Sequence, residues 1–341
     1  MDFLHIVKKA VESNASDIHL SANCRPAYRI NGTIRFLNES VLTDDDVSLM
    51  IKSCLSKDKY EDFLKSGDTD ASAEISGCGR FRVNAFRQSG GAALVMRVIN
   101  ENMPDISKLN LPRSIKKILG LKDGLVLVTG PTGSGKSTTL AAIINEYNKT
   151  RNGHIITIEE PIEYIHKPIN CIISQREIGT HSSSYAKALK AALREDPDII
   201  LVGEMRDLES IAVAITAAET GHLVLSTLHT IGASKTIDRL IDVFPPQQQQ
   251  QIRSQLSLVL KSVISQRLLP TSDGKGRIPA FETMFVNFAI SNLIREGKTA
   301  NISQSIQTGV NQGMITLERS IENLLDRGLI TKATADEYNN F

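Results

Sequence analysis

A glycine-rich stretch, GPTGSGKS at 130–137, has the residue types and the spacing of a loop that wraps a phosphate chain. Four aliphatic residues at 125–128 are typical of a buried strand, and a helical pattern follows from Ser137 to about Tyr147. Glycines let backbone N–H groups turn inward around phosphates, and the start of the helix adds its positive dipole. Lys136 would reach the β- and γ-phosphates and the Ser137 hydroxyl would bind Mg²⁺. A glycine-rich turn with a chance lysine is the alternative, but the flanking strand and helix favour a nucleoside triphosphate site. The residues predicted to bind the nucleotide here are Gly130, Pro131, Thr132, Gly133, Ser134, Gly135, Lys136, Ser137 and Thr138.

A second acidic position is needed to hold Mg²⁺, directly or through water. The apolar run Ile199–Val202 is followed by Gly203 and Glu204. Ligands of open α/β sheets bind at the carboxyl ends of the strands. We therefore predict that Glu204 and Ser137 hold the metal, with an ordinary acid at a strand end as the alternative.

Three carboxylates, Glu159, Glu160 and Glu163, follow another apolar strand, His154–Ile158. If this strand neighbours the strand before the phosphate loop, one of the three can orient or deprotonate the water that attacks the γ-phosphate. Such a role is worth roughly 10²- to 10⁴-fold in rate. The residues alone do not choose among the three.

Two histidines, His222 and His229, bracket a further apolar strand at 223–226. A single histidine is more often structural than catalytic. Two of them at the ends of one strand, in a sheet that already carries a phosphate loop, favour a functional role. Either imidazole could donate to phosphate oxygens and report whether a γ-phosphate is bound.

Three arginines lie in a different part of the chain. Arg80 and Arg82 are two apart on a predicted strand and therefore project from the same face, and Arg97 lies on the next strand. A solvated face is one interpretation. The other is that these side chains meet a neighbouring nucleotide as arginine fingers, worth roughly 10³- to 10⁵-fold in other triphosphatases.

The elements that carry these residues indicate two domains, which 341 residues allow. Residues 1–100 are predicted as a small α+β domain with an antiparallel sheet, followed by a proline-containing linker at 101–112. The predicted elements there are a helix at 3–13, strands at 27–30 and 33–36 around an Asn31-Gly32 turn, a helix from Thr43 to about Leu55, and strands at 79–86 and 92–99.

Residues 113–341 change to strands that alternate with helices, which predicts a parallel α/β sheet. A helix is predicted to begin at Pro245-Pro246 and to continue through Leu260 and Val263, because apolar residues recur at helical spacing. The tail from Ala289 is predicted as short helices, with Gly328 ending one and Thr331 beginning the next.

Composition limits the partners. The formal net charge of +1 gives no global field that would favour nucleic acid or an anionic membrane. We expect no signal peptide in the charged N-terminal segment, no transmembrane helix, and four reduced thiols rather than a zinc site or disulfides. These features favour an intracellular protein.

Taken together, the motifs resemble the secretion-type ATPases of type IV pilus and type II secretion systems, and within them the PilT family of pilus retraction (twitching motility) ATPases. The resemblance covers essentially the whole chain. Its motifs are ASDIHL at 15–20, GRFRVNAF at 79–86, GPTGSGKST at 130–138, EEPIE at 159–163, REDPDIILVGEMRD at 194–207, TAAETGHLVLSTLHT at 216–230 and NLIREGK at 292–298.

The resemblance implies an α/β fold with a RecA-like P-loop ATPase domain, preceded by a small α+β PAS-like N-terminal domain. It implies that Glu159 and Glu160 belong to the nucleotide site and that Glu163 is the general base. Glu204 matches the Walker B acid, His222 and His229 match the histidine box, and Arg80, Arg82 and Arg97 match arginines that contact nucleotide across subunits. It further implies a homohexamer that hydrolyses ATP with Mg²⁺, at the cytoplasmic face of the inner membrane, where it meets the membrane only through a pilus platform protein.

Two departures from the family pattern stand out. Glu160 replaces the usual aspartate, and Ser291 replaces the arginine of an AIRNLIRE segment tied to retraction. A pilus-assembly or type II secretion motor is the rival within the class, but the longer N-terminal region and four-cysteine insertion usual in those relatives are not found in this sequence. A nucleotide-gated regulator with little hydrolysis is the rival from another class, and a phosphate-loop kinase is a weaker one.

Overall fold

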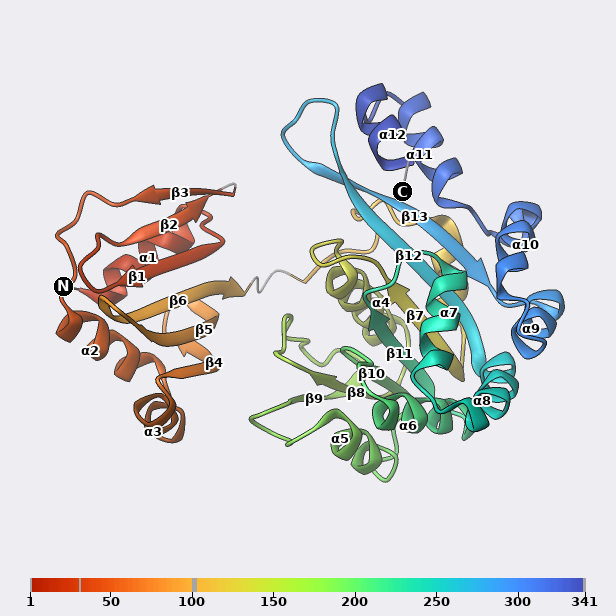
Figure 1. Ribbon diagram of the computed structural model, residues 1–341, viewed down its shortest axis with the longest axis horizontal. Helices are drawn as coiled ribbons and strands as arrows, with labels where there is room; N and C mark the ends of the chain where they lie inside the picture. The colour runs from red at the N-terminus through yellow and green to blue at the C-terminus, as the bar shows by residue number, and fades with distance from the viewer. Residues whose placement is uncertain (1, 31, 100–102, 340–341) are drawn as a thin grey trace. The chain divides into compact units, whose positions relative to one another are not determined.

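The computed structural model describes residues 2–30, 32–99 and 103–339. The chain folds into two compact units, Met1–Asn102 and Met103–Phe341 (Figure 1). The division falls within the segment predicted as a linker, and residues 103–112 group with the second unit. Glu101 and Asn102 of that segment lie outside the described residues.

The N-terminal unit is an antiparallel sheet of six strands in the order β3-β2-β1-β6-β5-β4. One face packs against the helices to form an apolar core, and the other face carries the arginines. The elements are α1 (Phe3–Glu12), β1 (Asp17–Ser21), β2 (Ala27–Ile30), β3 (Thr33–Phe36), α2 (Asp44–Cys54), α3 (Lys57–Ser66), β4 (Asp68–Ile75), β5 (Gly79–Gln88) and β6 (Gly91–Ile99).

Local sequence explains several of these elements. The Thr43 hydroxyl accepts the Asp46 N–H at 3.1 Å while the Asp46 carboxylate accepts the Thr43 N–H at 2.9 Å, a capping box that begins α2. Ile30 pairs with Thr33 as the predicted hairpin requires, although Asn31 of its turn lies outside the described residues. The alternation along β5 buries Phe81 completely against the helices. The sequence did not predict β1, β4 or α3.

The C-terminal unit is a seven-stranded sheet in the order β13-β12-β7-β11-β10-β8-β9, in which every pairing is parallel except that of β13. Its strands are β7 (Gly124–Thr129), β8 (Gly153–Glu159), β9 (Cys171–Glu177), β10 (Ile199–Val202), β11 (Leu223–Leu228), β12 (Leu260–Pro270) and β13 (Arg277–Phe285). Its helices are η1 (Arg113–Gly120), α4 (Lys136–Thr150), α5 (Tyr185–Ala192), α6 (Leu208–Glu219), α7 (Ala233–Asp242), α8 (Pro246–Val259), α9 (Phe288–Arg295), η2 (Thr299–Asn301), α10 (Ile302–Thr308), η3 (Val310–Gln312), α11 (Leu317–Asp326) and α12 (Lys332–Asn339).

Helices cover both faces of this sheet (Figure 1). Leu125 and Leu127 of β7 belong to a core shared with α5, α6, α7 and α8. Val126 and Val128 belong to a second core, on the opposite face, shared with α4 and η1. All six residues of β7 are buried, which explains why the strand is uniformly apolar rather than alternating. The strand before the phosphate loop is thereby fixed from both sides.

Two predictions about this unit were wrong. The sheet is not purely parallel, because β13 pairs antiparallel with β12. The helix predicted from Pro245 ends at Val259, and Leu260 and Val263 lie in β12, paired with β7. Helical and strand spacing are hard to tell apart over a short stretch of sequence. The backbone groups of the buried strand β7 need hydrogen-bond partners on both sides. β11 supplies them on one side, and β12 supplies them on the other. The strand β9 was not predicted from the sequence.

The C-terminal tail follows the predicted pattern of short helices. Gly328 takes a φ of +66° just after α11 ends, a conformation that glycine adopts without strain. The Thr331 hydroxyl accepts the Thr334 N–H at 3.1 Å and begins α12.

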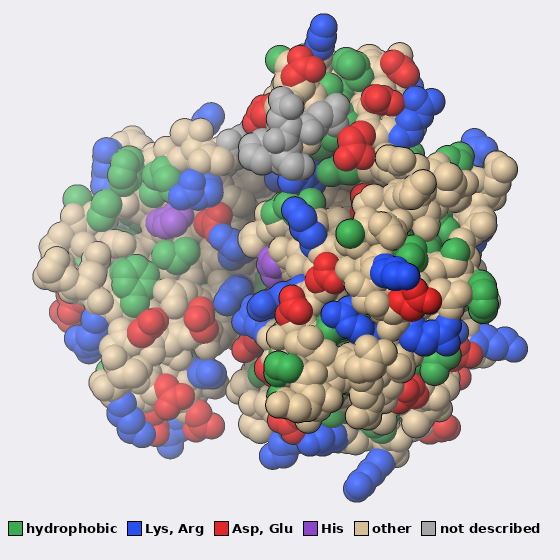
Figure 2. Space-filling model, turned by 45° about the vertical axis from the view of Figure 1, so that its right-hand side comes forward, with side chains coloured by type: hydrophobic (Ala, Val, Ile, Leu, Met, Phe, Trp, Pro, Cys, Tyr) green, Lys and Arg blue, Asp and Glu red, His purple; other side chains and the backbone are tan. Residues whose placement is uncertain are grey.

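Within the described part of the chain, no helix has the length and apolar character that a membrane span requires. Basic and acidic side chains are interspersed on the face drawn in Figure 2, in keeping with the formal net charge of +1.

Candidate active site

The predicted phosphate loop joins the end of β7 to the start of α4, as its sequence context requires. Gly130, Gly133 and Gly135 take φ values of +142°, +76° and +89°. A Cβ at Gly130 would lie 2.2 Å from the backbone oxygen of Gln266, so only glycine fits there. The outer part of the loop, residues 131–133, is exposed to solvent, and Ser134 is buried. The backbone therefore forms an open cradle at the N-terminus of a helix, the usual place for a phosphate.

Lys136 is folded into this loop. Its ammonium donates to the carbonyl oxygens of Gly130 at 2.9 Å and Pro131 at 3.1 Å, and the residue is only 8% exposed. Burial lowers the pKa of Lys136, while the negative charges of Glu204 and Glu163 act in the opposite direction. A cation held by neutral carbonyls beside two acids is well placed to neutralise phosphate oxygens.

Glu204 lies at the centre of a cluster at the carboxyl ends of β10 and β11. Its carboxylate accepts from the Arg206 guanidinium at 2.8 Å and lies 3.4 Å from Nε2 of His229. The other ring nitrogen of His229, Nδ1, is 3.4 Å from the hydroxyl of Thr132 in the phosphate loop. His229 thus lies between the predicted metal ligand and the loop and is within reach of both.

Glu159 ends β8, the strand that pairs with β10 on the side away from β11. Thr157 donates to its carboxylate at 2.7 Å and Gln175 at 3.4 Å. Burial raises the pKa of Glu159 to about 7, because these neutral donors offset only part of the cost of a buried charge. The β8 strand is separated from β7 by β10 and β11, so the condition stated for these three acids, that their strand neighbours the strand before the phosphate loop, is not met.

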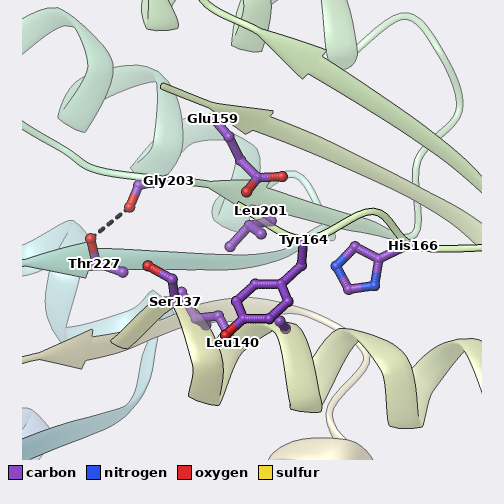
Figure 3. A pocket seen from close by; sticks show the side chains of 9 residues that line it. Ser137, Leu140, Glu159, Tyr164, His166, Leu201, Gly203 and Thr227 are labelled. Atoms are coloured by element: carbon purple, nitrogen blue, oxygen red, sulfur yellow. Dashed lines mark hydrogen bonds between the residues drawn. The ribbon is translucent and has the colours of Figure 1, made fainter. Parts of the chain in front are cut away.

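Glu159 points toward a small cavity that also reaches the phosphate loop (Figure 3). The cavity has a volume of about 30 Å³, room for about two water molecules. Its polar lining includes the Ser137 hydroxyl at the start of α4 and the Thr227 hydroxyl, which donates to the Gly203 carbonyl at 2.6 Å. The cavity is lined by Ser137, Leu140, Ala141, Glu159, Tyr164, His166, Leu201, Gly203 and Thr227.

The other two predicted acids are more open to solvent. Glu163 is exposed, and its charge nevertheless acts on Lys136. Glu160 is exposed as well, with a carboxylate oxygen 3.9 Å from Arg206. Thr138 of the loop is 3.0 Å from the Tyr164 hydroxyl, between the loop and this acidic segment. Both acids therefore lie on the same edge of the sheet as the phosphate loop.

His222 is placed differently from His229. It precedes β11, whereas His229 follows it, so the six residues Leu223–Leu228 separate them by roughly 20 Å. His222 Nδ1 lies 3.0 Å from the Ala217 carbonyl and 3.1 Å from the Thr220 hydroxyl. Of the two histidines, His229 therefore lies beside the phosphate loop and His222 lies at the opposite edge of the sheet, because the two ends of a strand lie at opposite edges.

The three arginines lie on the uncovered face of the N-terminal sheet. Arg82 and Arg97 are directly opposite each other on β5 and β6, so they share a face. Arg97 Nε donates to the buried Asp17 carboxylate at 2.8 Å, and its side chain is 67% exposed. Arg82 is exposed and Arg80 is half-buried. The structure places this row in a different unit from the phosphate loop.

Two residues of the site were missed. Arg206 falls within a motif quoted for the family resemblance, but nothing in its spacing predicted that it would pair with Glu204. Gln266 lies in β12, which was predicted in part as helix; its amide nitrogen donates to the Ser134 carbonyl at 2.6 Å. A glutamine in an apolar run, SVISQRLL at 262–269, is the only local signal that could have drawn attention to it.

The donor set fits Mg²⁺ with a nucleotide. A hydroxyl at Ser137 and a carboxylate at Glu204 are hard oxygen ligands, and Mg²⁺ in such sites usually takes one or two protein oxygens together with phosphates and water. Among the described residues, no group of three or more histidine, cysteine, aspartate or glutamate side chains could hold a metal by itself. Phosphate oxygens and water would complete the coordination.

A largely parallel α/β sheet with a glycine-rich loop and an acidic cluster at one edge is an arrangement typical of nucleotide-binding α/β proteins. The chain belongs to the Type II/IV secretion system protein family, whose model matches residues 2–309.

The particular relatives are proteins of pilus retraction. The chain is 47% identical to the type IV pilus retraction ATPase PilT of Pseudomonas aeruginosa, over 99% of this chain and 98% of that protein. It is also 47% identical to a twitching motility protein of Neisseria gonorrhoeae, over 92% of this chain and 84% of that protein. The crystal structure of the pilus retraction motor PilT with bound ADP superposes with a TM-score of 0.93, at 46% identity, over 99% of this chain and 96% of that one. The predicted family resemblance is confirmed.

Proposed function

We propose that this chain is a Mg²⁺-dependent ATP hydrolase that powers type IV pilus retraction. The single observation that carries the proposal is the cluster formed by the phosphate loop, Lys136, Glu204 and His229 at one edge of the sheet. The similarity to pilus retraction ATPases over almost the full length of both chains supports the biological role. We further propose that the C-terminal unit is a RecA-like ATPase domain and that the N-terminal unit is PAS-like.

In this proposal the loop amides and Lys136 bind the phosphates, and Thr132 and Thr138 line the same loop. Ser137 and Glu204 would hold Mg²⁺, which supplies charge neutralisation of the β- and γ-phosphate oxygens when bound. Glu163 takes a proton from the attacking water. His229 contacts both Glu204 and the loop, so it would sense whether a γ-phosphate is bound between them.

The remaining predicted residues act around this centre. Glu159 and Glu160 complete the acidic edge of the site. We propose that Arg80, Arg82 and Arg97, together with His222, act at contacts between subunits of a homohexamer. The motor would work at the cytoplasmic face of the inner membrane, through a pilus platform protein and without nucleic acid.

Steady-state hydrolysis by site variants tests the chemistry. Glu163→Gln should keep ATP binding and lose turnover by about 100-fold or more, because an amide of the same shape accepts no proton. Lys136→Ala should in addition weaken nucleotide binding, because it removes the cation facing the phosphates. Glu209→Gln is a matched control, since that carboxylate is 61% exposed and pairs with Lys190. Near-normal hydrolysis by the Glu163→Gln protein would overturn the assignment of the base.

A cell assay tests the direction of force. Replacing the chromosomal copy with the Lys136→Ala variant should leave pili on the surface and abolish their retraction. Loss of the pili themselves would instead identify an assembly motor.

A further inference from the structure

One buried amide joins β12 to the end of the phosphate loop and to the first turn of α4. Nε2 of Gln266 donates to the Ser134 carbonyl at 2.6 Å, near the end of the loop. Oε1 of the same amide accepts from the Thr139 hydroxyl at 2.9 Å, in the first turns of α4. Gln266 is 2% exposed and Thr139 is 3% exposed. The two bonds hold the amide in one orientation, because only its nitrogen can donate and only its oxygen can accept.

The backbone around this amide leaves little freedom. Ser265 pairs with Thr129, the last residue of β7, so Gln266 lies beside the first residue of the loop. A Cβ at Gly130 would come within 2.2 Å of the Gln266 carbonyl oxygen, and one at Gly135 would come within 3.1 Å of Nε2. The loop therefore rests against Gln266 at its beginning and at its end.

The contact with Ser134 has a directional consequence. In a trans peptide the carbonyl of one residue and the N–H of the next point in opposite directions. The Ser134 carbonyl is held toward Gln266, so the Gly135 N–H is aimed to the other side of the same peptide plane. Backbone N–H groups at this position, just before the helix, are the groups that a phosphate loop turns toward its ligand.

We propose that Gln266 is a positioning residue for phosphate binding, which fixes the Ser134–Gly135 peptide so that its N–H faces the nucleotide phosphates. The proposal rests on the proposed function of the loop. Gln266 does not touch the nucleotide in this account; it acts through the backbone of the loop. Thr139 acts one step further away, by setting which end of the Gln266 amide faces Ser134.

Nucleotide affinity measured on the full chain tests this proposal. A fluorescent ADP analogue is titrated into the wild type and into Gln266→Met, which has a similar length and makes neither hydrogen bond. The Kd should rise about tenfold, the size expected when a hydrogen bond to a charged group is misaligned. The KM for ATP should rise by a similar factor while kcat changes by less than about threefold, because the Gly135 N–H binds phosphate in the ground state and the transition state alike.

Two further variants separate positioning from general stability. Thr139→Val keeps the shape of the side chain and loses only the bond that orients the amide, so the Kd should rise about threefold. Ser262→Ala is the matched control: its buried hydroxyl donates to the Met284 carbonyl at 2.8 Å on the same strand, with no recorded contact to the loop. It should lower the thermal unfolding midpoint and leave the Kd unchanged.

The possible outcomes distinguish failure of the proposed function from failure of the role of Gln266. A wild-type chain that does not bind ADP would refute the proposed function itself. An unchanged Kd and KM in a folded Gln266→Met protein would overturn the role of Gln266 alone. If Gln266→Met does not fold, Thr139→Val decides, because an unchanged Kd in that variant would also overturn the proposal. A rise in Kd with Ser262→Ala equal to that of Gln266→Met would assign the effect to loss of stability.

Discussion

One carboxylate in each unit, the buried Asp17 and the half-buried Glu159, shows how differently the two sheets treat charge. Asp17 in the N-terminal sheet is 4% exposed. Burial alone would raise its pKa, but the hydrogen bonds from Ser16 and Arg97 and the charge of Arg97 outweigh it, and the pKa is lowered. Glu159 in the C-terminal sheet has only neutral donors, Thr157 and Gln175, and burial raises its pKa to about 7. The charge of the hydrogen-bond donor therefore decides whether the pKa of the carboxylate is raised or lowered.

The difference has a functional meaning. In the N-terminal sheet the charges are satisfied within the unit, because Asp17 holds Arg97 at 2.8 Å and leaves most of its side chain exposed in a fixed position. In the C-terminal unit the hydrogen-bond donors to Glu159 are neutral, and this acid lines the same cavity as the predicted metal ligand Ser137 (Figure 3). A bound cation would lower the free energy of the ionised Glu159. The N-terminal unit therefore presents arginines that are already held in place by an acid. The C-terminal unit presents acids that we propose a bound cation would neutralise.

The largest expected effect tests whether the arginines of the N-terminal unit serve the acidic edge of another subunit. Alanine substitution of Arg97 should lower turnover about 10³-fold if it acts as an arginine finger. Mixing the Arg97→Ala protein with the Lys136→Ala protein should restore part of the activity, because some interfaces then contain one intact composite site. Steady-state ATPase activity of the mixtures measures this, with Arg80→Ala and Arg82→Ala examined in the same way.

Arg87→Ala is the control for this experiment, since Arg87 lies on the same strand as Arg82 but stacks over Phe63. It should keep its activity. Mixed rings that assemble without any recovery of activity would favour a simple solvated face for the arginines.

An intermediate effect separates the two carboxylates by pH. The raised pKa of Glu159 means that the folded chain binds this proton more tightly than the unfolded chain, so the stabilisation is lost as pH rises toward 7. Between pH 5.5 and 8 the wild type should lose about 2 kcal/mol of unfolding free energy from this group. The Glu159→Gln variant should lose that part of the pH dependence in denaturant unfolding of the C-terminal unit.

Asp17→Asn is the matched comparison for the pH experiment. The pKa of Asp17 is lowered, so its carboxylate is ionised in both folded and unfolded chains throughout this range. The variant should therefore be less stable at every pH and retain the slope of the wild type. If the Glu159→Gln variant keeps the full slope, another group is responsible for it.

The smallest expected effect on hydrolysis concerns helix α9, a part of the C-terminal unit away from the phosphate loop in sequence. Arg295 ends α9 and is exposed, and Ser291, four residues earlier, donates to the Ser257 carbonyl of α8 at 2.6 Å. We predict that Ser291 is tolerated because Arg295 keeps a cation on this helix. Arg295→Ala should leave ATP turnover within about twofold of the wild type while abolishing retraction. A parallel loss of ATPase activity would place Arg295 in support of the ring or the site, and normal retraction would place the coupling surface elsewhere.

The sequence by itself determined the parts of this protein that depend on neighbours in the chain. The loop 130–137 needs glycines at fixed positions between a strand and a helix, and those requirements are local. The buried strands β7, β10 and β11 are read from uninterrupted apolar runs, and the capping box at Thr43 is read from four consecutive residues. Local steric and hydrogen-bonding rules act on such short spans, so their outcome is visible in the sequence.

Only the tertiary structure decided which residues meet. Gln266 reaches Ser134 from 132 positions away, because β12 pairs with β7. His222 and His229 share one strand and one motif, yet the strand carries them to opposite edges of the sheet. Pairing order depends on burial summed over many side chains from distant parts of the chain. A short segment such as 260–264, with apolar residues at 260, 263 and 264, is compatible with a helix or a strand on its own. It became a strand because the open side of β7 supplied the hydrogen bonds.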